Sequence, residues 1–138
     1  MQSAGQIEAS ACEIVNRFMQ DNMGRGAGTV TATYARGLLL VHLSDMLTTS
    51  EKKLSCGCGV DDHSASTLIR SMRDQLVRQG RDALIEALAT AIGRTPSSVL
   101  HDIDPTTADE ILVFTFTILA EPLVRLRAGR QQGGGRSA

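Results

Sequence analysis

The chain has 138 residues, of which 42% are hydrophobic and 21% charged, so it is long enough to bury a core in one domain without metal or disulfide staples. Its net charge is −1, and it contains one Tyr, three Phe and no Trp. These values argue against a nucleic-acid-binding protein, which needs a basic surface or aromatic side chains for base stacking.

The N-terminal part predicts an amphipathic helix over residues 6–22. Apolar side chains recur there at three- and four-residue spacing, with polar side chains between them. Gly24 follows as the expected end of the helix, because glycine adopts the left-handed backbone conformation at little steric cost. Gly26 and Gly28 then continue as a turn.

A β-hairpin and a short helix are expected next. Residues 29–35 alternate as a half-buried strand does, and residues 38–43 read as a second, more buried strand after a two-residue connection. Thr48 and Glu51 have the spacing of a capping box, in which each side chain accepts a hydrogen bond from a free backbone N–H. This pattern predicts a helix over residues 49–55.

The longest periodic pattern predicts a helix over residues 64–92 that ends at Gly93. Gly80 inside it indicates a bend or a close approach of another element. The expected buried stripe comprises Leu68, Ile69, Met72, Leu76, Ala83, Leu84, Ala87, Leu88, Ala91 and Ile92. The arginines of this helix are expected on a mostly solvated face, and they are Arg70, Arg73, Arg78 and Arg81.

Two further strands are expected at residues 98–104 and 110–118, followed by a short helix at 119–128. The glycine-rich residues 129–138 predict a disordered tail, so the single domain spans residues 1–128. Two hairpins cannot bury their apolar faces alone. We therefore expect an α+β fold of the order α-β-β-α-β-β. In this two-layer sandwich, the hairpins form one antiparallel four-stranded sheet that packs against the two main amphipathic helices.

Three patterns that carry chemistry in other proteins are weak here. The glycines around Arg25 follow a helix and precede a strand, whereas a phosphate-binding loop needs the reverse order. Cys56, Cys58 and His63 are residue types that bind metal ions and lie close together in the sequence. However, one Cys-x-Cys pair with a single histidine matches structural zinc sites poorly. Strand alternation places His101 on the side of its strand opposite to Asp102 and Asp104, and no Ser or Cys has a positional claim to be a nucleophile. We therefore expect a protein that is not an enzyme, with no cofactor and no bound metal.

Several segments together resemble the MpsC-like family, which was formerly described as a domain of unknown function. They are Phe18 to Gly26, Leu39 to Leu43, the pattern Met46-Leu47-Thr48-x-x-Glu51-x-x-Leu54, the helix around Arg73, and Ile111 to Phe114. The similarity covers residues 5–118. Cys56 to Gly59 departs from the more polar segment expected at that place, and the region after Leu119 has no counterpart.

The resemblance implies a small cytosolic bacterial protein linked to a Na+-translocating, membrane-potential-generating system of the kind connected with inorganic-carbon uptake. A chain without a spanning segment can only be a peripheral or regulatory component there, which docks on a membrane partner at the inner face of the membrane. The expectation is thus a non-enzymatic accessory protein that binds a membrane transport protein. Our candidates for contact with this partner or with an anion are Gly24, Arg25, Gly26, Glu51 and Arg73.

Two other functions and one oligomeric state follow from the same residues. The chain can be read as a stand-alone module that senses a small ligand or an anion, in which case ligand would raise its melting temperature. Cys56 and Cys58 leave open a thiol or metal site. The edges of an open sheet also allow the chain to form a homo-oligomer.

Overall fold

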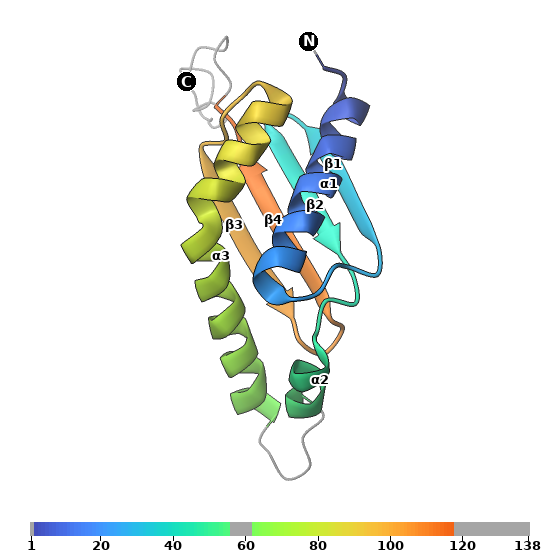
Figure 1. The fold of residues 1–138 in the computed structure, drawn as a ribbon, viewed down its shortest axis with the longest axis vertical. Helices are drawn as coiled ribbons and strands as arrows, with labels where there is room; N and C mark the ends of the chain where they lie inside the picture. Colours follow the sequence, from blue (N-terminus) through green and yellow to red (C-terminus); the bar gives the residue numbers. More distant parts are fainter. Residues whose placement is uncertain (1, 56–61, 118–138) are drawn as a thin grey trace, which may run out of the picture.

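The structure is a computed structural model that describes residues 2–55 and 62–117, in which the helices lie on one face of an antiparallel sheet (Figure 1). The elements in chain order are α1 (Ala4–Met23), β1 (Val30–Ala35), β2 (Leu38–Leu43), α2 (Thr49–Ser55), α3 (Asp62–Ile92), β3 (Ser98–Asp104) and β4 (Asp109–Thr115). The predicted α+β class and element order are confirmed. The predicted helix at 119–128 and the tail at 129–138 lie outside the described residues.

The four strands are ordered β1-β2-β4-β3, so the second strands of the two hairpins meet in the middle of the sheet. In the register of this central pair, Leu40 lies opposite Val113. The β1–β2 turn consists of Arg36 and Gly37, which have φ angles of 54° and 76°. Positive φ at both turn residues matches the right-handed twist of the flanking strands, which explains why so short a connection closes this hairpin.

The predicted helix ends are confirmed by their hydrogen bonds. Gly24 ends α1 with a φ of 78°, and its N–H donates to the Gln20 carbonyl. At the start of α2, the Thr48 N–H donates to Glu51 Oε1 at 2.9 Å and the Glu51 N–H donates to Thr48 Oγ1 at 3.2 Å. Both contacts satisfy backbone groups that a helix terminus leaves without a partner.

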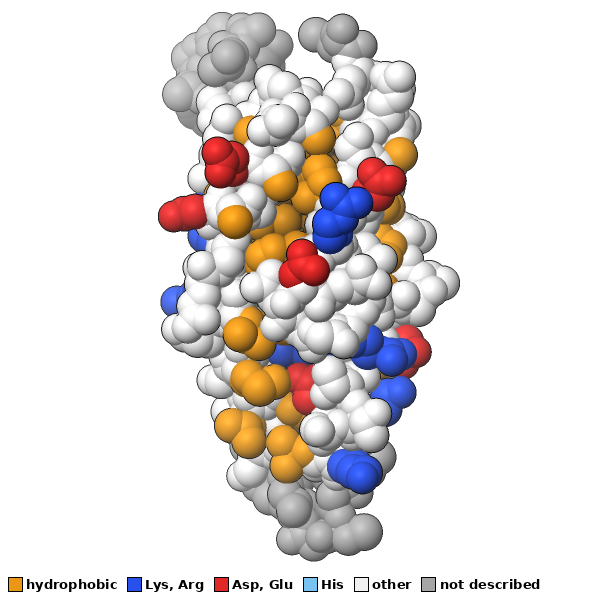
Figure 2. Space-filling model, in the orientation of Figure 1, with side chains coloured by type: hydrophobic (Ala, Val, Ile, Leu, Met, Phe, Trp, Pro, Cys, Tyr) orange, Lys and Arg blue, Asp and Glu red, His pale blue; other side chains and the backbone are white. Residues whose placement is uncertain are grey.

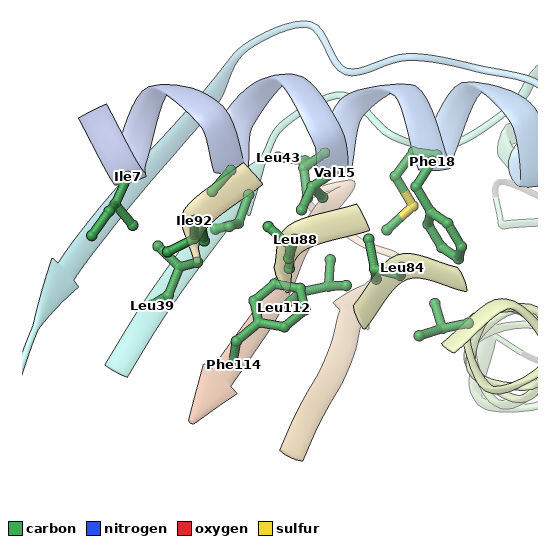
Figure 3. Packing of buried hydrophobic residues seen from close by; sticks show 14 of the residues in the cluster. Ile7, Val15, Phe18, Leu39, Leu43, Leu84, Leu88, Ile92, Leu112 and Phe114 are labelled. Atoms are coloured by element: carbon green, nitrogen blue, oxygen red, sulfur yellow. The ribbon is translucent and has the colours of Figure 1, made fainter. Parts of the chain in front are cut away.

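The main core lies between the sheet and the pair α1 and α3 (Figure 3). Gly80 allows the two helices to approach closely, because a Cβ at this position would lie 2.6 Å from the Phe18 ring. The buried side chains that Figure 3 labels are Ile7, Val15, Phe18, Leu39, Leu43, Leu84, Leu88, Ile92, Leu112 and Phe114. A smaller buried cluster comprises Leu47, Ile69 and Ile103.

The N-terminal half of α3 corrects two predictions. Leu68 and Met72, expected in the buried stripe, are 57% and 44% exposed. Arg73, expected on a solvated face, is fully buried. The reason is that α1 ends beside the middle of α3 and leaves the N-terminal half of that helix uncovered on this side (Figure 1). Arg73 instead continues the buried row of Ile69 and Val77, at four-residue spacing.

Candidate functional site

Arg73 is the centre of a buried polar network that joins α2, α3 and β4. Its guanidinium donates to both carboxylate oxygens of Glu51, at 2.8 and 3.1 Å, and to Glu110 Oε1 at 2.8 Å. It also donates to the Met46 carbonyl at 2.5 Å. The side chains of Arg73 and Glu110 are fully buried, and that of Glu51 is 7% exposed. Removing such charges from water is costly, so the network is stable only because each charged group has close partners of opposite sign.

His101 on β3 extends the network from Glu110. Its Nε2 lies 2.5 Å from Glu110 Oε2, and the imidazole N–H is the donor because a carboxylate has no proton to give. The other ring nitrogen, Nδ1, is buried without a hydrogen-bond partner and lies 3.8 Å from Asp74 Oδ1.

Glu51 has two tasks at the start of α2. One is the capping of that helix through Thr48, and the other is the ion pair that holds the helix against Arg73 of α3. Burial is the largest influence on the Glu51 carboxyl and by itself raises the pKa, but hydrogen bonds from Arg73 and Thr48 outweigh it. The pKa of Glu51 therefore lies below its usual value, and the carboxylate stays ionised while it fixes α2.

An apolar groove of about 450 Å³ lies directly in front of this network. The C-terminal end of α1, α2 and the N-terminal half of α3 form its walls, and Glu51 contributes to its lining. Figure 2 shows hydrophobic side chains gathered over this half of α3. The apolar lining comprises Met23, Leu54, Leu68, Ile69, Met72 and Leu76. The groove lies beside the half of α3 that α1 does not cover, next to the C-terminal end of α1.

Two lysines lie on α2 near the groove, although neither belongs to its lining. Lys52 and Lys53 are exposed in the last turn of α2, next in sequence to Glu51 and Leu54, which do line the groove. Figure 2 shows Lys and Arg side chains gathered on this side of the molecule. Lys52 forms an ion pair with Asp45 at 3.4 Å. An apolar groove with positive charge nearby suits an occupant that has an apolar face and an acidic flank.

The glycine segment predicted to contact a partner holds two loops together. Arg25 donates to the Asp45 carbonyl at 2.8 Å and pairs with the Asp45 carboxylate at 2.5 Å. Asp45 itself has a φ of 55°, so the pair fastens a left-handed turn between β2 and α2. Gly24 ends α1, and a Cβ on Gly26 would lie 2.9 Å from the Gln20 side chain. Backbone geometry and packing explain both glycines.

Of the five predicted contact residues, the structure brings Glu51 and Arg73 together, with Arg25 in a separate cluster. Burial places Arg73 out of a docked partner's reach, whereas Glu51, at 6% exposed, contributes to the lining of the groove. The sequence interpretation missed Glu110 and His101 as members of the network. A signal existed for Glu110, because strand alternation places it on the same side as the buried Leu112 and Phe114.

The remaining predicted chemistry has little to rest on in the described residues. His101 does lie opposite Asp102 and Asp104, as predicted, because those carboxylates are on the outer face of β3. Cys56, Cys58 and the side chain of His63 lie outside what the structure describes. Burial, followed by the nearby Glu8 carboxylate, raises the pKa of the Cys12 thiol, which disfavours a reactive thiolate there. Within residues 2–55 and 62–117, no group of three His, Cys, Asp or Glu side chains is arranged to hold a metal ion.

Comparison with known proteins gives one match. Residues 3–118 match a family model described as "Na+-translocating membrane potential-generating system (MpsC)". No curated protein and no solved structure matches the chain. The match covers the segments that carried the resemblance in the sequence, and it includes every element around the groove. Among the described helices, none is long and apolar enough to cross a membrane.

Proposed function

Because the chain belongs to the MpsC family, whose name links it to a Na+-translocating, membrane-potential-generating system, we propose that it is a non-enzymatic accessory protein of such a system and acts by binding a partner. The apolar groove between α1, α2 and α3 is the observation that carries this proposal. It exposes Leu68 and Met72 to water, although both would be buried if another helix lay beside them.

The shape of the groove favours a helix as its occupant. The helix α1 packs against the C-terminal half of α3, where Phe18 contacts Gly80. The groove continues this helix–helix contact toward the N-terminus of α3. Leu68, Met72 and Leu76 follow one another at four-residue spacing, so they form a ridge that can pack against a partner's helix. We propose that the partner inserts one amphipathic helix there, in line with α1.

The lysines of α2 favour an acidic flank on that helix. Lys52 and Lys53 lie on the short helix that forms this wall of the groove, next in sequence to the lining residues Glu51 and Leu54. Charges of opposite sign near a binding surface steer association. The partner of this proposal is a membrane protein of the ion-translocating system with a helix of this kind exposed to the cytoplasm. The chain itself acts in the cytoplasm, peripheral to the inner membrane face.

Arg25 has an indirect role in this proposal. Its pair with Asp45 holds the loop that leads into α2, and α2 is one wall of the groove. A contribution of Arg25 to binding would therefore come from positioning that wall.

The experiment is site-specific photo-cross-linking in the source cells. A photoreactive phenylalanine analogue replaces Met72 in the groove, and in a matched control it replaces Thr67, which is exposed on the side of the same helix that faces away from the groove. The expected result is a cross-link from position 72 to a helix of a multi-span ion-translocating protein, absent from position 67. Purified partner should then lose at least about tenfold in affinity for Leu68→Glu, as expected of a central apolar contact.

Either of two results would refute the proposal. One is a position-72 variant that cross-links only to copies of its own chain. The other is a folded Leu68→Glu protein that binds the partner at full strength. A melting temperature that rises with a small anion or metabolite, while the groove variants behave as wild type, would favour the sensing module instead.

A further inference from the structure

The face of the sheet opposite the helices is apolar and uncovered in the described residues. Both α1 and α3 lie on the other face (Figure 1). Of the large hydrophobic side chains that the structure shows as exposed, only Leu68 and Met72 belong to the groove. The rest lie on this outer face of the sheet, and they are Leu38, Leu40, Leu100 and Ile111. Patches of this kind on a protein surface mark interaction sites.

The strand register makes these side chains one continuous patch. Val113 in the centre lies opposite Leu40 on one side and opposite Leu100 on the other. Leu38 is two residues from Leu40 along β2, and Ile111 is two residues from Val113 along β4, so all point to the same side. Threonines of β1 continue the patch toward one edge as a polar rim, because Thr33 lies opposite Leu40.

The patch has an internal near-symmetry that suits a second copy. The sheet order β1-β2-β4-β3 relates the two hairpins by an approximate twofold axis between β2 and β4. About this axis Leu40 corresponds to Val113, and Leu38 corresponds to Ile111. A surface that presents similar apolar side chains on both sides of its centre can match a copy of itself in an isologous contact.

The charges at the two ends of the sheet select one orientation. Asp102, Asp104 and Asp109 lie at one end of β3 and β4, where Asp102 pairs with Arg70 at 2.8 Å and Asp109 lies 3.0 Å from His42. The exposed Arg36 lies in the β1–β2 turn at the other end. If two copies stacked with equal ends together, carboxylates would face carboxylates. In the antiparallel stack, the acidic end of one copy faces the end that carries Arg36 in the other.

We propose that two copies of this chain associate through the outer faces of their sheets, stacked face to face in this antiparallel orientation. Leu40 and Val113 then pack near the twofold axis against the same residues of the second copy. The interface is separate from the groove between the helices, so one dimer presents two grooves on opposite sides.

The size of the patch sets the strength of the dimer. Four strands spaced about 4.8 Å apart, two of six residues and two of seven and so about 20 and 23 Å long, give a face of roughly 410 Å² per copy and about 800 Å² in total. This lies at the low end of specific interfaces, where complexes are reversible. The dimer should therefore dissociate on dilution.

The test is sedimentation velocity of the full chain over a wide range of concentrations. The expected result is a monomer–dimer equilibrium that Leu40→Glu and Leu100→Glu each shift to monomer. Leu68→Glu is the matched control, because it introduces the same charge at an exposed leucine outside the patch. Circular dichroism checks that each variant is folded. Arg36→Glu should weaken the dimer several-fold at low salt and less at high salt.

A folded chain that stays monomeric at every concentration would overturn the proposal. A dimer that survives both sheet-face substitutions, or that is lost on Leu68→Glu, would also overturn it. Unchanged affinity on Arg36→Glu at low salt would refute the antiparallel orientation.

Discussion

Replacing Arg73 with methionine should destabilise the protein more than any change of a surface charge. The substitution keeps a long side chain in place but removes the donors that Arg73 gives to Glu51, Glu110 and the Met46 carbonyl. Two buried carboxylates then face each other's charge without a cation. Breaking a buried ion pair in this way costs about 3–5 kcal/mol.

This cost is a large part of the roughly 5–15 kcal/mol that stabilises a domain of ordinary size. At about 3–4 °C per kcal/mol for a chain of this length, the melting temperature should fall by roughly 10–20 °C. Urea denaturation followed by circular dichroism measures the loss. The matched control is Arg70→Met, three residues earlier on the same helix. The side chain of Arg70 is 54% exposed, and its pair with Asp102 should contribute little to stability.

A second substitution separates the charge from the packing. In Arg73→Met combined with Glu51→Gln and Glu110→Gln, no buried carboxylate is left without a cation, so much of the lost stability should return. The reasoning is refuted if Arg73→Met destabilises no more than Arg70→Met. It also fails if the triple variant is as unstable as the single one, because the cost would then come from packing and not from charge.

The remaining predictions concern close packing and acid. Gly80→Ala should lower the free energy of unfolding by about 1–3 kcal/mol in urea denaturation, because the new Cβ would lie 2.6 Å from the Phe18 ring. Gly5→Ala in α1 is its control and should be neutral or stabilising by up to about 1 kcal/mol, since only Ser3 Oγ at 3.9 Å is near. The pKa of Glu51 is lower in the folded chain than its ordinary value of 4.5, so its contribution is complete above pH 4.5 and is lost as the pH falls through the folded pKa. Thermal melts should therefore show that the melting temperature of the wild type falls below this pH, and that the difference in melting temperature between wild type and Arg73→Met becomes smaller. A difference that stays constant with pH would show that the Glu51–Arg73 ion pair is not the cause of the lost stability.

Much of the fold could be predicted because its signals are local. The capping box of Thr48 and Glu51, the C-cap at Gly24 and the alternation of β1 each depend on residues close together in the chain, and the structure confirms all of them. The close packing allowed by Gly80 was predicted as one of two alternatives, although the sequence could not identify Phe18 as its partner.

The site could be predicted only in part, because its members meet through tertiary contacts. Glu51 and Arg73 were both singled out, but 22 residues separate them and nothing local shows that they form an ion pair. The exposure of Leu68 and Met72 depends on where α1 ends relative to α3, which helical periodicity alone cannot reveal. Periodicity tells which residues share a face of a helix, whereas the neighbouring elements decide whether that face is covered.

The buried network and the exposed groove are physically connected through α2. This helix has only seven residues, too few to be stable alone in water, so tertiary contacts must hold it. Glu51 supplies such a contact through Arg73, and the same short helix presents Leu54 to the groove. The fully buried Arg73, which no partner can contact, therefore controls the shape of the surface that a partner would bind. The substitution Arg73→Lys keeps the positive charge but loses the planar, forked guanidinium. It should disturb the groove even where the fold survives, because a lysine cannot hold Glu51, Glu110 and the Met46 carbonyl in the same arrangement.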